Sequence, residues 1–186
     1  VDVRSTQDGI LILSHDPTIG RYLISDHSFA FLQQCDSNLV TLEEALMKTQ
    51  KHNISLNLDL KDISAARAMY TLIRNTRCNE TVVVSGCHRE AYELVHSFAP
   101  SLRIMLNIEA DELNNLAQYR KLNPYGLNLD YRLLTDSFMQ EAHKWEFPIF
   151  VWTVDNEKDI RSCLAAGVSG ITTNRPDLFF HCISGK

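Results

Sequence analysis

Four polar residues in three short segments carry the side chains that could act together on a substrate. Asp2 lies in a short apolar strand, and a Thr-x-Asp-Gly turn and a second apolar strand then lead to His15. Asp59 and Lys61 stand near the end of a later apolar stretch. Carboxylates bind hard cations, an imidazole transfers protons near neutral pH, and an ammonium group binds anions. These four residues are therefore the first candidates for a site.

Asp2 and Asp59 are the candidate metal ligands. Two carboxylates at one edge of a sheet make an all-oxygen site suited to Mg²⁺ or Ca²⁺. Asp59 considered alone is more typical of an ordinary solvated residue. Lys61 changes this interpretation, because an unpaired ammonium inside a barrel is costly. An anionic substrate or a metal-bound phosphate would account for all three residues.

His15 is the candidate proton-transfer group, because its ordinary pKa lies near neutrality. We expect Asp16 to orient His15 or the loop backbone. Trp152 lies near the end of an apolar strand. It is expected either to pack in the core or to form an apolar wall against the carbon skeleton of a substrate.

Apolar strands alternate with amphipathic helical stretches along most of the chain. The pattern predicts helices that start near 41 and 64, and further helices over 91–98, 109–122, 135–145 and 156–166. It predicts strands over 1–3, 54–60, 82–84, 102–108, 126–129, 148–154 and 169–173. A side hairpin is expected at 9–13. Strand–helix alternation with short loops implies a parallel sheet with helices on its faces.

Two α/β architectures fit this order, an open doubly wound sheet and an incomplete barrel. Residues 54–60 alternate, with leucines on one face and Asn57 and Asp59 on the other, and residues 126–130 repeat this pattern. Central strands of a doubly wound sheet are usually apolar on both faces, whereas barrel strands can turn polar groups inward near their carboxyl ends. The alternation favours the barrel.

Bulk properties bound the remaining possibilities. The 186 residues predict a single domain over 1–186, and the net charge of −5 without a basic stripe argues against a nucleic-acid partner. No apolar run is long enough to span a bilayer. Five scattered cysteines favour free thiols and a cytoplasmic location over disulfides or a zinc site. The oligomeric state is left open.

Five blocks of the sequence resemble the glycerophosphodiester phosphodiesterase family, in the order found in that family. They cover residues 1–21, 40–46, 56–61, 151–155 and 167–178. The resemblance implies a TIM (β/α)8 barrel that hydrolyses glycerophosphodiesters to glycerol 3-phosphate and an alcohol with a divalent metal. It implies metal binding for Asp2 and Asp59, acid–base catalysis for His15, and substrate contacts for Lys61 and Trp152.

Several positions depart from the family pattern. The first strand and helix, with the H-R-G motif and a second histidine, and the first Glu of the metal site have no counterpart here. We therefore expect that the chain is an N-terminally incomplete member of a family of longer enzymes. Whether residues 1–186 are active alone is left open. Asp59 stands in place of Glu, Asp155 and Asn174 stand in place of Asn and Asp, and Ser85-Gly86-Cys87 stands where S-S-F is common.

Two other functions stay open at this point. A related phospholipase that acts on intact lipid would need an apolar membrane-facing loop, for which residues 21–40 offer only Phe29, Phe31 and Leu32. A non-catalytic barrel could instead bind a phosphorylated metabolite or a partner protein. The shorter acid at Asp59 and the absent groups favour this second alternative somewhat.

Overall fold

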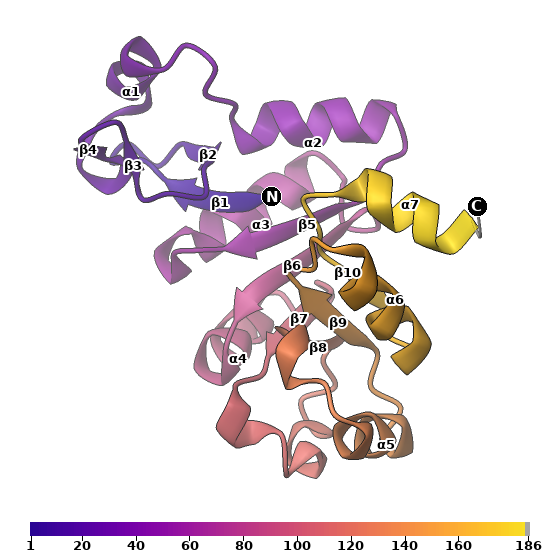
Figure 1. Cartoon of the computed structure of the whole chain (residues 1–186). Coiled ribbons are helices and arrows are strands. Elements are labelled where there is room, and N and C mark those ends of the chain that lie inside the picture. The colour runs from indigo at the N-terminus through magenta and orange to yellow at the C-terminus, as the bar shows by residue number, and fades with distance from the viewer. Residues whose placement is uncertain (185–186) are drawn as a thin grey trace. The chain divides into compact units, whose positions relative to one another are not determined.

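The computed structural model describes residues 1–184, and its elements group into two compact units, Val1–Ile104 and Met105–Lys186 (Figure 1). Each unit contains strands of a mainly parallel sheet with helices packed against them. The prediction that residues 1–186 form a single domain stays a prediction.

Four strands of the main sheet belong to the first unit, in the order β6-β5-β1-β2. These strands are β1 (Asp2–Ser5), β2 (Leu11–Leu13), β5 (Leu56–Leu60) and β6 (Val82–Cys87). β1, β5 and β6 are parallel, and β2 runs antiparallel to β1. This arrangement confirms the predicted side hairpin.

The turn of that hairpin follows from its Thr-x-Asp-Gly sequence. The Thr6 hydroxyl donates to Asp8 Oδ1 at 2.6 Å and accepts from the Ile10 backbone N–H at 3.0 Å. Gly9 adopts a φ of 79°, which favours glycine. Asp8 Oδ1 also accepts from the Phe29 N–H at 3.0 Å, which ties the turn to the next helix.

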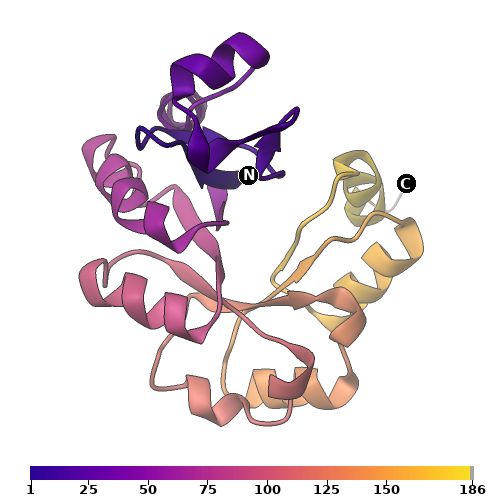
Figure 2. The same ribbon diagram turned by 90° about the vertical axis from the view of Figure 1, so that its left-hand side faces the viewer.

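A small excursion follows the hairpin and was not predicted. It contains β3 (Thr18–Ile19), β4 (Tyr22–Leu23), the 3₁₀ helix η1 (Ile24–Asp26) and α1 (Phe29–Cys35), all in the indigo and purple part of the chain (Figure 2). Buried Ile12, Ile24, Leu32 and Leu39 form its apolar cluster, and Phe29 and Phe31 pack against it. These elements are too short to produce a clear periodic pattern.

The longer helices of the first unit lie where the sequence predicts them. They are α2 (Leu42–Lys51), α3 (Ala66–Asn75), which follows the 3₁₀ turn η2 (Ile63–Ala65), and α4 (Arg89–Phe98). Thr41 and Glu44 form the capping box that starts α2.

The second unit contains four parallel strands in the order β10-β9-β8-β7. Their bounds are β7 (Ile104–Asn107), β8 (Gly126–Asp130), β9 (Ile149–Trp152) and β10 (Gly170–Ile171). The helices are η5 (Tyr131–Leu133), α5 (Asp136–Lys144), α6 (Glu157–Ala166) and α7 (Pro176–Ser184).

The predicted helix over 109–122 is wrong. Two short 3₁₀ helices take its place, η3 (Ala110–Glu112) and η4 (Leu116–Tyr119). The Asn114-Asn115 pair separates them, and Asn115 has a non-helical backbone with φ −145° and ψ 62°. Asparagine side chains compete with the helix for backbone hydrogen bonds, so the pair interrupts the apolar period.

All five cysteines are free, as the sequence predicted, and Cys35 is exposed whereas the other four are buried. Among residues 1–184, no helix combines the length and the apolar character that crossing a membrane requires.

Candidate active site

The pairing of β1 with β5 brings the two candidate metal ligands side by side. Asp2 lies directly opposite Asp59 in this parallel ladder. The Asp59 N–H donates to the Val1 carbonyl at 2.8 Å, and the Lys61 N–H donates to the Val3 carbonyl at 3.3 Å. Neighbouring strands lie about 4.8 Å apart, so two side chains on the same face of such a pair can share one ligand.

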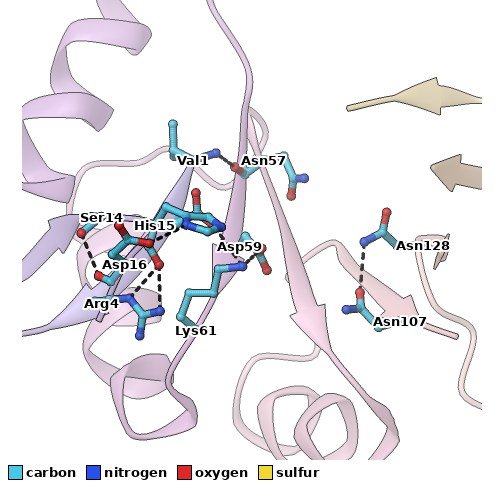
Figure 3. Close-up of polar contacts among 11 residues, drawn as sticks. Val1, Arg4, Ser14, His15, Asp16, Asn57, Asp59, Lys61, Asn107 and Asn128 are labelled. Atoms are coloured by element: carbon cyan, nitrogen blue, oxygen red, sulfur yellow. Dashed lines mark hydrogen bonds and ion pairs between the residues drawn. The ribbon is translucent and has the colours of Figure 1, made fainter. Parts of the chain in front are cut away.

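Lys61 shows that the two carboxylates converge, and Figure 3 shows its contact with Asp59. Its Nζ lies 3.0 Å from Asp2 Oδ1 and 2.5 Å from Asp59 Oδ2. Burial alone would lower the pKa of Lys61, but hydrogen bonds to Asp59 and Asp2 outweigh it and hold that pKa above its ordinary value. Two carboxylates and one ammonium leave the cluster with one net negative charge.

Alternation along β5 explains why Asp59 faces this cluster. Leu58 and Leu60 are buried, at 0% and 5% exposure, and occupy the face opposite to Asp59. Because successive side chains of a strand point to opposite faces, burial of the leucines fixes the direction of the acid. The sequence predicted this division correctly.

Gly86 on β6 lies against the Asp59 carboxylate, and the sequence analysis gave it no role. A Cβ atom at Gly86 would lie 2.3 Å from Asp59 Oδ1 and 2.7 Å from the Leu60 carbonyl oxygen, and its φ is +81°. Glycine is therefore the residue that leaves room for this carboxylate. The departure of Ser85-Gly86-Cys87 from the family pattern was the available signal.

Cys87 is the other group beside Asp59 that could be chemically active. Burial and, secondarily, the negative charge of Asp59 raise the pKa of its thiol to about 12. The thiol therefore stays protonated near neutral pH and is a poor nucleophile, because the thiolate is the reactive form.

His15 lies on the hairpin directly after the strand that pairs with β1. The Ser14 N–H donates to the Asp2 carbonyl at 3.1 Å, so the residue that precedes His15 lies beside Asp2. The Arg4 guanidinium donates to the His15 carbonyl from Nε at 3.2 Å and from Nη2 at 2.8 Å (Figure 3). The His15 loop is therefore held from the same strand that carries Asp2.

The His15 ring is oriented by its neighbour Asp16, as the sequence suggested. His15 Nδ1 lies 3.0 Å from Asp16 Oδ1, and the two side chains are 79% and 75% exposed. A carboxylate accepts hydrogen bonds, so Nδ1 carries the proton in this contact. The remaining ring nitrogen, Nε2, then faces solvent and can exchange a proton with a substrate.

Trp152 belongs to the second unit, so it is not among the residues that the β1–β5 pairing brings together. It is the last residue of β9 and lies opposite Asp130 of β8. Its side chain is 37% exposed, which argues against a role in core packing alone.

The second unit carries a polar pair that the sequence analysis did not identify. Asn107 at the end of β7 lies opposite Asn128 of β8. The Asn128 Nδ2 donates to Asn107 Oδ1 at 3.1 Å, and Asn128 is only 6% exposed (Figure 3). Alternation in residues 126–130 predicted that Asn128 faces away from the leucines, but it could not identify its partner.

The residues present fit a Mg²⁺ ion that retains much of its water. No group of three or more His, Cys, Asp or Glu side chains within residues 1–184 has the arrangement of a metal site. Asp2 and Asp59 nevertheless already share one cation, the Lys61 ammonium. Mg²⁺ is commonly held by one or two carboxylates, several waters and substrate phosphates, whereas Ca²⁺ takes six to eight oxygen ligands.

Comparisons with known proteins give relatives that share one name. Relatives named glycerophosphodiester phosphodiesterase occur in Bacillus altitudinis, 26% identical over 95% of this chain and 82% of the relative, and in Bacillus subtilis, 24% identical over 96% and 74%. A structure so named from Parabacteroides distasonis aligns with a TM-score of 0.85 at 23% identity, over 99% of this chain and 82% of that one.

A phosphodiesterase from Oleispira antarctica, solved with the product sn-glycerol-3-phosphate, aligns with a TM-score of 0.87 at 18% identity, over 98% of this chain and 83% of that one. These likenesses confirm the predicted α/β fold of the TIM-barrel type. The model of the Glycerophosphoryl diester phosphodiesterase family matches residues 1–178. The chain therefore belongs to this enzyme family, as its sequence blocks predicted.

Proposed function

We propose that this chain hydrolyses glycerophosphodiesters to glycerol 3-phosphate and an alcohol, with the help of a divalent metal. The observation that carries the proposal is the convergence of Asp2 and Asp59 on one cation position, occupied by Lys61 Nζ at 3.0 and 2.5 Å. The family match and the names of the relatives support the choice of substrate class.

The charge of the cluster supports the need for a metal. Asp2, Asp59 and Lys61 together carry one net negative charge, which would repel the anionic phosphodiester. A divalent cation on the two carboxylates would reverse the sign of the site. When bound, such an ion would stabilise the negative charge that develops at the phosphate oxygens.

The side chains of the chain itself then have distinct roles. Lys61 can turn from the carboxylates to a phosphate oxygen, because its ammonium is a flexible point charge. His15 Nε2 exchanges a proton with the attacking or leaving oxygen. Arg4 and Asp16 hold the His15 backbone and ring, so that the imidazole is oriented before the substrate binds.

Trp152 supplies the proposed apolar wall for the carbon skeleton. Its exposed indole can lie against aliphatic carbons without losing a hydrogen bond. The cytoplasmic location suggested by the free thiols stays part of this proposal.

A direct assay tests the function. The purified protein is mixed with glycerophosphocholine or glycerophosphoethanolamine, and glycerol 3-phosphate is measured with Mg²⁺, with Ca²⁺ and with a chelator. We expect product with Mg²⁺ and none with the chelator. We expect Asp2→Asn and Asp59→Asn to abolish Mg²⁺-dependent turnover, whereas the exposed Asp111→Asn serves as a matched control.

The two alternatives give different outcomes in the same experiment. Phe29, Phe31 and Leu32 are used by α1 against its own apolar cluster, which leaves them poorly suited to a membrane-facing loop and disfavours a phospholipase. Release of product from intact phospholipid vesicles would reverse this conclusion. Binding of glycerol 3-phosphate without turnover of any diester would favour a non-catalytic barrel.

A further inference from the structure

Two of the departures from the family pattern contact each other in the second unit. Asp155 follows β9 by three residues, and Asn174 follows β10 by three residues. Asp155 Oδ2 accepts from Asn174 Nδ2 at 2.9 Å, and its Oδ1 accepts from the Asn174 backbone N–H at 2.7 Å. The Thr173 hydroxyl also donates to Asp155 Oδ1, at 3.1 Å. Both oxygens of one carboxylate are therefore bound to a segment 18 and 19 positions later in the chain.

We infer that Asp155 and Asn174 form a positioning pair that fixes the loops after β9 and β10 and, through the first loop, the side chain of Trp152. Two backbone bonds lie between the pair and the strands. The Val154 N–H donates to the Thr172 carbonyl at 2.9 Å, and the Thr172 N–H donates to the Val151 carbonyl at 2.8 Å. Trp152 stands between Val151 and Val154, and both of these residues are hydrogen-bonded to Thr172 at the start of the second loop.

The chemistry of the pair assigns different roles to its two members. A carboxylate only accepts hydrogen bonds, so Asn174 must present its amide NH₂ to Asp155. An amide at 155 could still accept from the backbone and from Thr173, and could donate to Asn174 after that side chain turns over. A carboxylate at 174 would instead face Asp155 with a like charge, which is unfavourable at hydrogen-bond distance. The two single exchanges are therefore predicted to differ.

The functional part of this inference rests on the proposed function, because Trp152 is taken as the wall for the substrate. In steady-state kinetics we expect Asn174→Asp to raise KM about tenfold with a smaller change in kcat, and Asp155→Asn to change KM less than threefold. The double variant D155N/N174D should return KM to within threefold of the wild type, because an amide and an acid again face each other.

A spectroscopic measurement tests the pair without any turnover. The chain has two tryptophans, so 5-fluorotryptophan labelling gives two ¹⁹F resonances, and Trp152→Phe identifies that of Trp152. We expect Asn174→Asp to shift or broaden the Trp152 resonance, the double variant to restore it, and the Trp145 resonance to stay unchanged throughout.

Each result is decisive. If the effects of the two single exchanges on KM and on the Trp152 resonance add up in the double variant, the two side chains do not act as a pair. A lower melting temperature in Asn174→Asp with an unchanged Trp152 resonance and KM would show a purely structural contact, and would overturn the positioning role. If the wild type hydrolyses no diester, the proposed function fails, whereas the ¹⁹F result still decides whether the pair positions Trp152.

Discussion

The strand ends of the two units carry polar groups of different kinds. In the first unit, two acids share one ammonium group, and the imidazole of His15 is 79% exposed. In the second unit, Asn107 bonds to Asn128, and Asp155 has hydrogen-bond donors on both oxygens. The first set retains a net charge and open binding capacity, whereas the second is largely satisfied within the protein.

The two kinds of polar group suit different tasks. Groups with unmet charge can change partners when a ligand arrives, and perturbed charged groups cluster at functional sites. Satisfied amides and capped acids instead make a site rigid before the substrate binds. The contrast favours the first unit as the place of the proposed reaction.

After loss of either metal-binding acid, loss of the imidazole should have the largest effect. His15→Ala should lower turnover by about two to four orders of magnitude, because a positioned acid–base group contributes that much. The free energy of unfolding of His15→Ala should differ from that of the wild type by less than about 0.5 kcal/mol, since the side chain is mostly exposed. Steady-state kinetics and urea unfolding measure the two quantities, with exposed His52→Ala as the control. Wild-type turnover in His15→Ala would contradict the assignment of proton transfer to His15.

A methyl group at position 86, beside Asp59, should mainly lower the free energy of unfolding. Gly86→Ala would place a Cβ atom 2.3 Å from Asp59 Oδ1 at a φ of +81°. We expect a loss of about 2–4 kcal/mol in the free energy of unfolding, from backbone strain and overpacking together.

Gly20→Ala is the matched control for this crowding. Gly20 also has a positive φ, +59°, but nothing lies within 4 Å of the position that a Cβ would take. It should lose only about 1 kcal/mol, from the backbone alone. Equal losses in the two variants, measured by urea unfolding, would show that the contact with Asp59 is unimportant.

Removal of the shared ammonium should have a moderate effect. Lys61→Met should reduce kcat/KM by about 10- to 100-fold, because one charged contact to the phosphate is lost. Lys48→Met, an exposed lysine on α2, should leave kcat/KM within twofold of the wild type. A Lys61→Met enzyme as active as this control would mean that the ammonium serves only to offset the charge of the two acids.

The smallest effect concerns pH and the second unit. Hydrogen bonds from Asn174, and to a lesser degree from Thr173, hold the pKa of Asp155 below its ordinary value. A lowered folded-state pKa stabilises the protein above the unfolded-state pKa of about 3.9, and this contribution is lost as the pH falls through the folded-state pKa.

The difference in unfolding free energy between wild type and Asp155→Asn should therefore be constant from pH 7 to 5 and should shrink below about pH 4. Urea unfolding across this range measures it. A difference that grows on acidification would contradict the hydrogen-bond pattern around Asp155.

The sequence allowed the parallel strands, the hairpin and the facing acids to be predicted, because period-two alternation and turn chemistry act locally. Asn57 and Asp59 alternate with leucines, and this pattern alone determines their face. The sequence could not reveal that Gly86 leaves room for Asp59 or that Asn128 bonds to Asn107, since those contacts join different strands. The helix expected over 109–122 failed because local hydrogen bonding at Asn114 and Asn115 overrode an apolar period.

The hydrogen-bond ladder between β1 and β5 makes the site sensitive to a deletion within β5 but tolerant of insertions outside the ladder. Asp2 and Asp59 meet only because Val1 and Val3 accept the N–H groups of Asp59 and Lys61. Loss of a single residue within β5 would exchange its two faces, so that leucines would replace the acid at the cation position. Insertions between Lys51 and Leu56, outside this ladder, would leave the carboxylates in place. The most sensitive element of the site is thus the count of residues in one short strand.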